Sequence, residues 1–129
     1  MYQTSTELGI ALSEFVPSRI PREEFFITTK VHPQLGIAKN DIEGTLREEL
    51  NQLKLDYVDL YLIHNPFFPD GVTIEEVWKQ MEEVHEKGLA RDIGISNFGA
   101  EEIEKLMEIA NIKPAVNQIE MHPYLYAQE

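Results

Sequence analysis

The chain has 129 residues, of which 23 are acidic and 11 basic, so its formal charge is -12, and it contains no cysteine. This acidic balance argues against a nucleic-acid partner and against an anionic membrane surface, since both repel a negative chain. The lack of cysteine excludes disulfides, thiolate catalysis and cysteine-based zinc sites. The sequence has no apolar run near membrane-span length and no signal-peptide pattern at its start. We therefore expect a cytoplasmic protein.

The first two predicted elements are a helix and a strand. Residues 5–14 have Leu8 and Leu12 four positions apart on one face, with hydroxyl residues at the start that can cap the helix. After a proline-containing loop, the β-rich run at 24–31 predicts a strand.

Two capping-box patterns predict the next helices. Asn40 is followed by Glu43, and Thr73 by Glu76, which is the spacing that pairs a cap with the third helical residue. Gly88 stands where a C-terminal cap glycine belongs. The apolar residues behind these caps are Ile42, Leu46, Leu50 and Leu53 in one helix and Val77, Met81 and Val84 in the other.

Three further strands are predicted at 57–64, 92–96 and 114–120, with a helix at 100–110 between the last two. In that last helix the residues expected to face inward are Ile103, Leu106, Met107 and Ala110. Strands that alternate with helices imply a parallel sheet, either doubly wound or closed as a barrel.

The strand ends favour the barrel. No strand is followed by a glycine-rich phosphate turn, yet every strand ends in polar residues, as in (β/α)₈ barrels, whose sites are built from many strand ends. These polar residues are Lys30, His64, Ser96, Asn97, Gln118 and Glu120. Four strands form only half of such a barrel. We therefore expect residues 1–129 to be one partial barrel domain, either a piece of a longer chain or a unit that self-associates through its exposed edges.

The chain resembles the aldo-keto reductases, which are NADPH-dependent (β/α)₈ enzymes that reduce carbonyls to alcohols. The resemblance rests on segments in the family's order, spread over nearly the whole chain: FITTK, LDYVDLYLIH, IGISNF and PAVNQIE, with YQ and ELG near the start. Asn-Pro-Phe-Phe after the histidine is most similar to the fungal ketoamide and polyketone reductase branch. The resemblance places the chain at about strands three to six of the barrel.

The same resemblance assigns roles to residues. It puts the catalytic tyrosine at Tyr2, the lysine at Lys30 and the histidine at His64. The residues that it assigns to the nicotinamide carboxamide are Ser96, Asn97 and Gln118, and those that it assigns to the substrate pocket are His32 and Asn65. The family's catalytic aspartate precedes the tyrosine and has no counterpart here, and the strands that distinguish NADPH from NADH are absent. The implied cofactor is NADPH, with NADH as the alternative, and the implied partner is a small carbonyl substrate.

These residue types suit the reaction, because a lysine ammonium lowers a phenol's pKa and a neutral imidazole can donate to a carbonyl oxygen. Each residue taken alone has a plainer interpretation: Tyr2 as a chain end, His64 as a core histidine, Gln118 as a buried amide. His122 has no second ligand at metal spacing, so we expect no metal site. Two alternatives stay open: an inactive half barrel with an interaction role, and another barrel enzyme that uses Lys30 as a Schiff-base amine.

Overall fold

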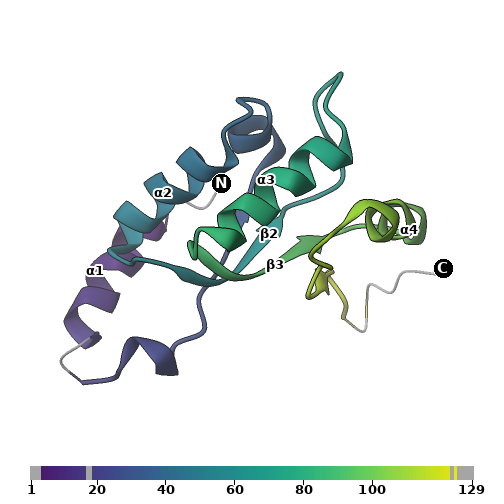
Figure 1. The fold of residues 1–129 in the computed structure, drawn as a ribbon. Coiled ribbons are helices and arrows are strands. Elements are labelled where there is room, and N and C mark those ends of the chain that lie inside the picture. The colour runs from purple at the N-terminus through teal and green to yellow at the C-terminus, as the bar shows by residue number, and fades with distance from the viewer. Residues whose placement is uncertain (1–3, 17–18, 123, 125–129) are drawn as a thin grey trace.

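The structure is a computed structural model that describes residues 4–16, 19–122 and 124. Helices and strands alternate through these residues (Figure 1). The α-helices are α1 (Ser5–Phe15), α2 (Ile42–Leu53), α3 (Ile74–Glu86) and α4 (Ala100–Ile109). The strands are β1 (Thr28–Val31), β2 (Val58–Ile63), β3 (Ala90–Ser96) and β4 (Asn117–Gln118). A 3₁₀ turn (Arg22–Glu24) precedes β1, and a π-helical turn (Pro33–Ile37) follows it.

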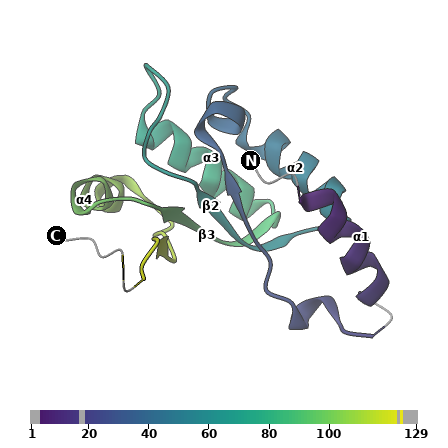
Figure 2. The same cartoon turned by 180° about the vertical axis from the view of Figure 1, so that it is seen from behind.

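The four strands form one parallel sheet in the order β1-β2-β3-β4, which confirms the predicted βαβ organisation. Helices α2, α3 and α4 follow one another along one face of this curved sheet, and α1 packs beside α2 (Figures 1 and 2). A doubly wound sheet carries helices on both faces, whereas a barrel carries them only outside. The arrangement is therefore half of a (β/α)₈ barrel, with one edge of β1 and one edge of β4 lacking a partner strand among the described residues.

The core lies between the sheet and this helical layer. It includes Leu46 and Leu50 of α2, Trp78 and Met81 of α3, and the residues of β2 that face them. All six residues of β2 are buried, and this strand lies between β1 and β3 in the sheet.

Local signals predicted two of the helix ends correctly. Thr73 and Glu76 form the expected capping box at the start of α3. Gly88 lies just past the end of α3 with φ of 71°, a left-handed conformation in which a side chain would be strained.

Two predicted N-caps were wrong. The N-cap of α2 is Asp41, whose carboxylate accepts from the Gly44 amide at 2.8 Å, rather than Asn40. Asn40 instead adopts a left-handed conformation in the preceding turn. In α1 the N-cap is Thr4, which makes no side-chain capping bond.

Two predicted core residues are exposed. Leu8 of α1 is 43% exposed, because the helix approaches α2 through Gly9, where a Cβ would collide with the Gln52 carbonyl. Met107 of α4 is also 43% exposed, because Leu106 is the buried residue of that turn.

The strands differ in length from the predicted ones. β1 is confined to 28–31, because residues 22–24 form the 3₁₀ turn, and β3 begins two residues earlier than predicted. β4 has only two residues and pairs with β3.

Candidate active site

The site is built where the parallel strands end. Because their register is in step, residues that leave neighbouring strands at the same level lie side by side: Lys30 pairs with Leu62 and Leu62 with Gly94. His64 and Ser96 lie two positions further along, and the long Lys30 side chain reaches this level from β1, so that the three residues converge at the C-terminal edge of the sheet. Gly94 helps, because a Cβ there would meet Leu62 and the Val116 carbonyl, so β4 can approach closely.

Ser96 is at the centre of the hydrogen bonds at this edge. Its buried hydroxyl accepts from the Lys30 ammonium and from the Asn97 amide, both at 3.1 Å. The same hydroxyl donates to the Gln118 carbonyl at 2.8 Å. One serine thus links the ends of β1, β3 and β4.

Asn97 connects the end of β2 to the hydrogen bonds around Ser96. Its side-chain amide donates to the His64 carbonyl at 3.0 Å, and its backbone amide donates to the Gln118 carbonyl at 3.0 Å. Asn97 has φ of 61°, a conformation that asparagine tolerates better than most residues. The turn after β3 therefore holds the end of β2 in place.

His64 is half-buried, and its ring lies edge-on to that of His32, with centroids 5.4 Å apart and planes at 88°. Burial lowers the pKa of His64, and the nearby charges of Lys30 and His32 lower it further. The imidazole is thus neutral near pH 7 and able to donate one hydrogen bond.

The two residues assigned to the substrate pocket lie beside this group. His32 begins the turn after β1, and its Nδ1 accepts from the Gln34 amide at 3.2 Å. The side-chain oxygen of Asn65 accepts from the Phe67 amide at 3.0 Å, which folds the start of the loop after β2.

Tyr2, the predicted acid, lies outside the described residues. Among the described residues, the side chain bonded to the Lys30 ammonium is Ser96 and not a tyrosine. Tyr61 is buried in the core on the helix side of β2, where burial raises the pKa of its phenol. Tyr57 lies before β2, at the opposite end of the sheet.

Some of the polar side chains at this edge have hydrogen-bonding groups available for a nicotinamide carboxamide, and others do not. The side chains of Asn97 and Gln118 are exposed amides, which suits them to pair with another amide. The Ser96 hydroxyl already makes three bonds within the chain, so a cofactor would have to replace one of them. Gln118 contacts its neighbours here through its backbone, and the carboxamide role of all three residues remains a prediction.

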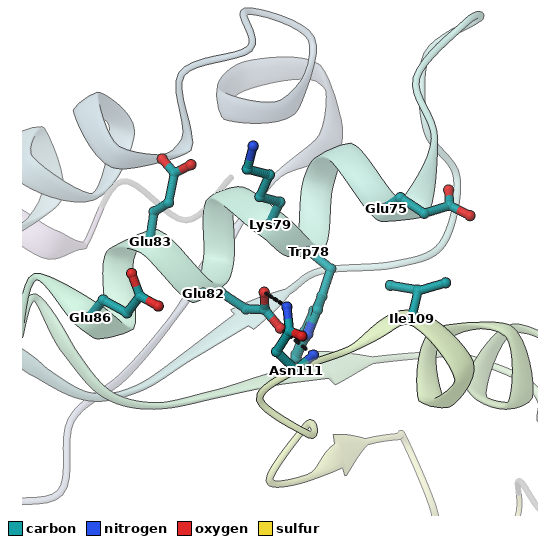
Figure 3. A pocket seen from close by; sticks show the side chains of 8 residues that line it. All are labelled: Glu75, Trp78, Lys79, Glu82, Glu83, Glu86, Ile109 and Asn111. Atoms are coloured by element: carbon teal, nitrogen blue, oxygen red, sulfur yellow. Dashed lines mark hydrogen bonds between the residues drawn. The ribbon is translucent and has the colours of Figure 1, made fainter.

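A separate hollow of about 440 Å³ lies between α3 and the segment after α4 (Figure 3). Its lining has four glutamates and one lysine, which disfavours a phosphate-bearing cofactor. Figure 3 shows Glu82 and Trp78 turned toward Asn111. Glu82 accepts from the backbone amides of Asn111 and Ile112 at 2.7 and 2.9 Å, and the Trp78 indole donates to the Ile112 carbonyl at 2.9 Å. These contacts hold α3 to the turn after α4.

None of the helices in ranges 4–16 and 19–122 is long and apolar enough to cross a membrane. Across the same part of the chain, no cluster of three or more histidine, aspartate or glutamate residues is placed to hold a metal ion.

The sequence predicted which polar residues end the strands but not how they connect. The bond from Lys30 to Ser96 joins residues 66 positions apart, and the bond from Asn97 to the His64 carbonyl joins residues 33 apart. Neither pair occupies equal positions in the register, because Lys30 is level with Leu62 and Gly94 while Ile63 is level with Ile95, so strand position alone did not indicate these bonds.

A parallel half barrel with lysine, histidine, serine and asparagine gathered at its C-terminal edge defines a class of (β/α)₈ enzyme centre. The Aldo/keto reductase family profile matches residues 1–129, and the chain belongs to this family.

Relatives and solved structures agree with that membership. The chain is 40% identical over 131 residues to the NADPH-dependent alpha-keto amide reductase of Saccharomyces cerevisiae, covering 99% of this chain and 41% of that protein. It is 38% identical over 153 residues to aldo-keto reductase family 1 member A1 of Mus musculus, covering 100% of this chain and 45% of that protein. The chain thus spans less than half the length of these relatives.

Among solved structures, aldose reductase from Giardia lamblia superposes with a TM-score of 0.88 at 29% identity, covering 95% of this chain and 47% of that one. An aldo-keto reductase of Bombyx mori in complex with NADP superposes with a TM-score of 0.86 at 38% identity, covering 93% and 41%.

Proposed function

We propose that this chain supplies the catalytic edge of an NADPH-dependent reductase that converts an aldehyde or ketone to an alcohol. The observation that carries the proposal is the convergence of Lys30, His64 and Ser96 from three strands, held by the bonds from Lys30 to Ser96 and from Asn97 to the His64 carbonyl. The Saccharomyces cerevisiae and Bombyx mori proteins, named for NADPH and NADP, support the choice of cofactor.

In this proposal His64 holds the substrate. Its neutral imidazole donates a hydrogen bond to the carbonyl oxygen and orients the carbon for attack. Burial and the nearby Lys30 charge keep the ring neutral, so the bond does not depend on a proton taken up from solvent near pH 7.

Lys30 tunes the proton donor, which we assign to Tyr2 on the family resemblance. A phenol with a pKa near 10 is a poor acid–base group at neutral pH, and an adjacent ammonium favours its phenolate. The bond to Ser96 fixes the Lys30 ammonium without neutralising it, since a hydroxyl carries no charge. The bound cofactor supplies the hydride, and Tyr2 supplies the proton to the alkoxide oxygen.

Asn97 and Gln118 would bind the nicotinamide carboxamide through their exposed side chains, with Ser96 joining them by exchanging one of its bonds. The partners we propose are the cofactor and a small carbonyl compound, with no nucleic acid or membrane, in the cytoplasm.

The test is whether the full-length protein reduces aldehydes and 2-oxo esters. The reaction is measured as the loss of absorbance of the reduced nicotinamide. Wild type should oxidise NADPH only when a carbonyl is present. Lys30→Met and His64→Gln should retain the fold by circular dichroism and lose turnover. A well-folded wild type that leaves NADPH intact with every carbonyl tried would rule the proposal out.

The alternative of an inactive half barrel keeps one supporting observation, the partnerless edges of β1 and β4 within the described residues. Titration of NADPH into residues 1–129 alone, measured by cofactor fluorescence, distinguishes the inactive half barrel from the reductase. Micromolar affinity would contradict an inactive fragment. Concentration-dependent dimerisation without NADPH binding would favour an interaction role through these edges.

A further inference from the structure

The loop between β2 and α3 contains the one Asp-Gly pair of the sequence, Asp70-Gly71. This loop projects past the start of α3 (Figures 1 and 2), and both residues of the pair are exposed. Exposed loop tips are the places at which a folded chain is most open to reaction. The proposed reductase chemistry uses neither residue.

A β-turn at the loop tip leaves the two groups that could react without partners. The Val72 amide donates to the Pro69 carbonyl at 3.1 Å, which closes the turn around Asp70 and Gly71. Within residues 19–122, the Asp70 carboxylate accepts no hydrogen bond and forms no ion pair, and the Gly71 amide donates to no acceptor. The carboxyl carbon and the next backbone nitrogen are thus both available to react with each other.

Gly71 places no steric barrier in the way of that reaction. Its φ is 81°, and a Cβ built on it would meet no other atom within 4 Å. A bulky side chain would shield its own backbone nitrogen and restrict φ, whereas glycine has no side chain and rotates freely. The Gly71 nitrogen can therefore turn toward the Cγ atom of Asp70.

The other aspartates lack this combination of exposure, free carboxylate and following glycine. The Asp41 carboxylate caps α2, and the buried Asp59 carboxylate pairs with Arg22 at 2.7 Å. Asp92 lies inside β3, where the sheet fixes the backbone on both sides of it. Asp56 is exposed, but a tyrosine follows it. These differences single out the pair in the loop.

We propose that Asp70-Gly71 is a covalent modification site, at which the chain converts to an isoaspartyl linkage without an enzyme. The Gly71 nitrogen bonds to Cγ of Asp70, and the carboxyl hydroxyl leaves with the N–H proton as one water, which closes a five-membered imide. Water then adds to the imide. When the bond from the nitrogen to the main-chain carbonyl breaks, the backbone runs through Cγ. The net change is an isomerisation, with no atom gained and nothing oxidised or reduced.

The modification changes a short connection between two fixed points. Phe68 packs beside Phe98, with ring centroids 6.5 Å apart, and Thr73 caps α3, so that residues 69–72 connect these anchors. An isoaspartyl linkage adds one methylene carbon to this path, or about 1.5 Å of chain. We expect the turn bond of the Val72 amide to be lost, which hydrogen exchange would report as faster exchange of that amide in the converted fraction. Unchanged exchange there would overturn this part of the proposal.

The experiment ages the folded full-length protein for weeks in warm neutral buffer, with circular dichroism as the check on folding. An isoaspartyl-specific carboxyl methyltransferase and a labelled methyl donor measure the total linkage formed, and fragmentation mass spectrometry locates it. We expect the linkage to accumulate at Asp70 more than about tenfold faster than at Asp56. Equal rates at both would show that the glycine and the turn contribute nothing, and would overturn the inference.

Two variants of the same residue bracket the wild type. Asp70→Glu keeps the charge but would need a six-membered imide, so it should lower methyl acceptance at this position by more than about tenfold. Asp70→Asn presents a neutral amide, which a nitrogen attacks more readily than a carboxylate, and it loses ammonia in place of water. It should convert at least about tenfold faster than wild type. A glutamate variant that accepts as much methyl label as wild type would contradict the assignment.

A peptide of residues 66–74 supplies the reference rate without tertiary structure. The folded protein should convert at a rate within about tenfold of the peptide, because the loop holds neither reacting group. An Asp70 that stays intact in the folded chain while the peptide converts would overturn the inference. Carbonyl reduction is measured separately, and neither result depends on the other.

Discussion

Charged side chains are arranged differently at the two ends of the sheet. At the N-terminal end, Asp59 is 4% exposed and bonds to Arg22 at 2.7 Å and to the Ile27 amide at 2.9 Å. Arg22 and Arg91 both lie over the Tyr57 ring, at 4.2 and 4.4 Å from its centroid. Opposite charges are thus paired where the strands begin.

At the C-terminal end, Lys30 lies near His32 and His64, and no carboxylate forms an ion pair with it within the described residues. Hydroxyl and amide groups hold the lysine instead. At the N-terminal end opposite charges are paired within the chain, although Arg22 Nε is a buried donor without a partner among the described residues. The C-terminal end keeps donors for other molecules. In barrels of this type the first end serves stability and the second serves chemistry.

The sharpest test of this division is at the C-terminal end. His64→Gln should lower kcat/KM for carbonyl reduction by about 10²- to 10⁴-fold, the usual contribution of a positioned acid–base group. Its unfolding free energy should stay within about 0.5 kcal/mol of wild type, because the backbone bonds of His64 remain. Steady-state kinetics and urea denaturation measure the two effects. A large stability loss with little kinetic change would reverse the roles of the two ends.

The matching test at the N-terminal end is Asp59→Ala. It strands the Arg22 charge in a largely buried position, so we expect a loss of about 3–5 kcal/mol in unfolding free energy. kcat/KM of the folded enzyme should change by less than about threefold, since the site is at the other end of the strands. Asp92→Ala is the control, because Asp92 is exposed on the neighbouring strand. Similar losses for both variants would argue against the buried network.

Glu82 extends the comparison to the outer layer. Burial raises the pKa of its carboxyl, but the amides of Ile112 and Asn111 outweigh this effect, so the pKa lies below the usual carboxyl range. A depressed carboxyl pKa stabilises the fold above the unfolded-state pKa, and this stabilisation is lost as pH falls through the folded-state pKa.

Glu82→Gln should therefore cost about 1.5–3 kcal/mol near pH 7, the range for hydrogen bonds to a charged group. The difference in unfolding free energy between this variant and wild type should shrink as pH falls below 4.5, the ordinary pKa of a glutamate carboxyl. Urea denaturation across pH measures it, with exposed Glu75→Gln in the same helix as the control. A gap independent of pH would contradict this account.

The smallest expected effects come from replacing two residues that share a left-handed backbone conformation, one near each end of the sheet. Lys54 ends α2 with φ of 57°, and Asn97 follows β3 with φ of 61°. Lys54→Gly should stabilise the fold by about 0.5 kcal/mol, because relief of left-handed strain exceeds the entropy cost of glycine.

Asn97→Gly gains the same relief but loses the amide bonds to the His64 carbonyl and Ser96, so we expect a net loss of about 1 kcal/mol and weaker cofactor binding. Thermal unfolding and NADPH titration check the pair. Equal stabilisation by both glycines would show that the asparagine side chain contributes nothing.

Local signals predicted much of this molecule. Alternating β-rich and helical patterns indicated four parallel strands in the right order, and the Thr73 capping box was placed correctly. The errors occurred where a neighbour decides the outcome. Gly9 brings α1 against α2 and turns Leu8 outward, and only two residues of the predicted last strand pair with β3.

The sequence by itself determined the elements and the polar residues that end the strands, because periodicity and β propensity act within a few positions of the chain. Only the tertiary structure decided that the Lys30 ammonium rests on Ser96, that Asn97 holds the end of β2, and that His32 meets His64 edge-on. These contacts depend on the register of parallel strands whose residues are far apart along the chain. Register is set by the packing of the whole sheet against its helices.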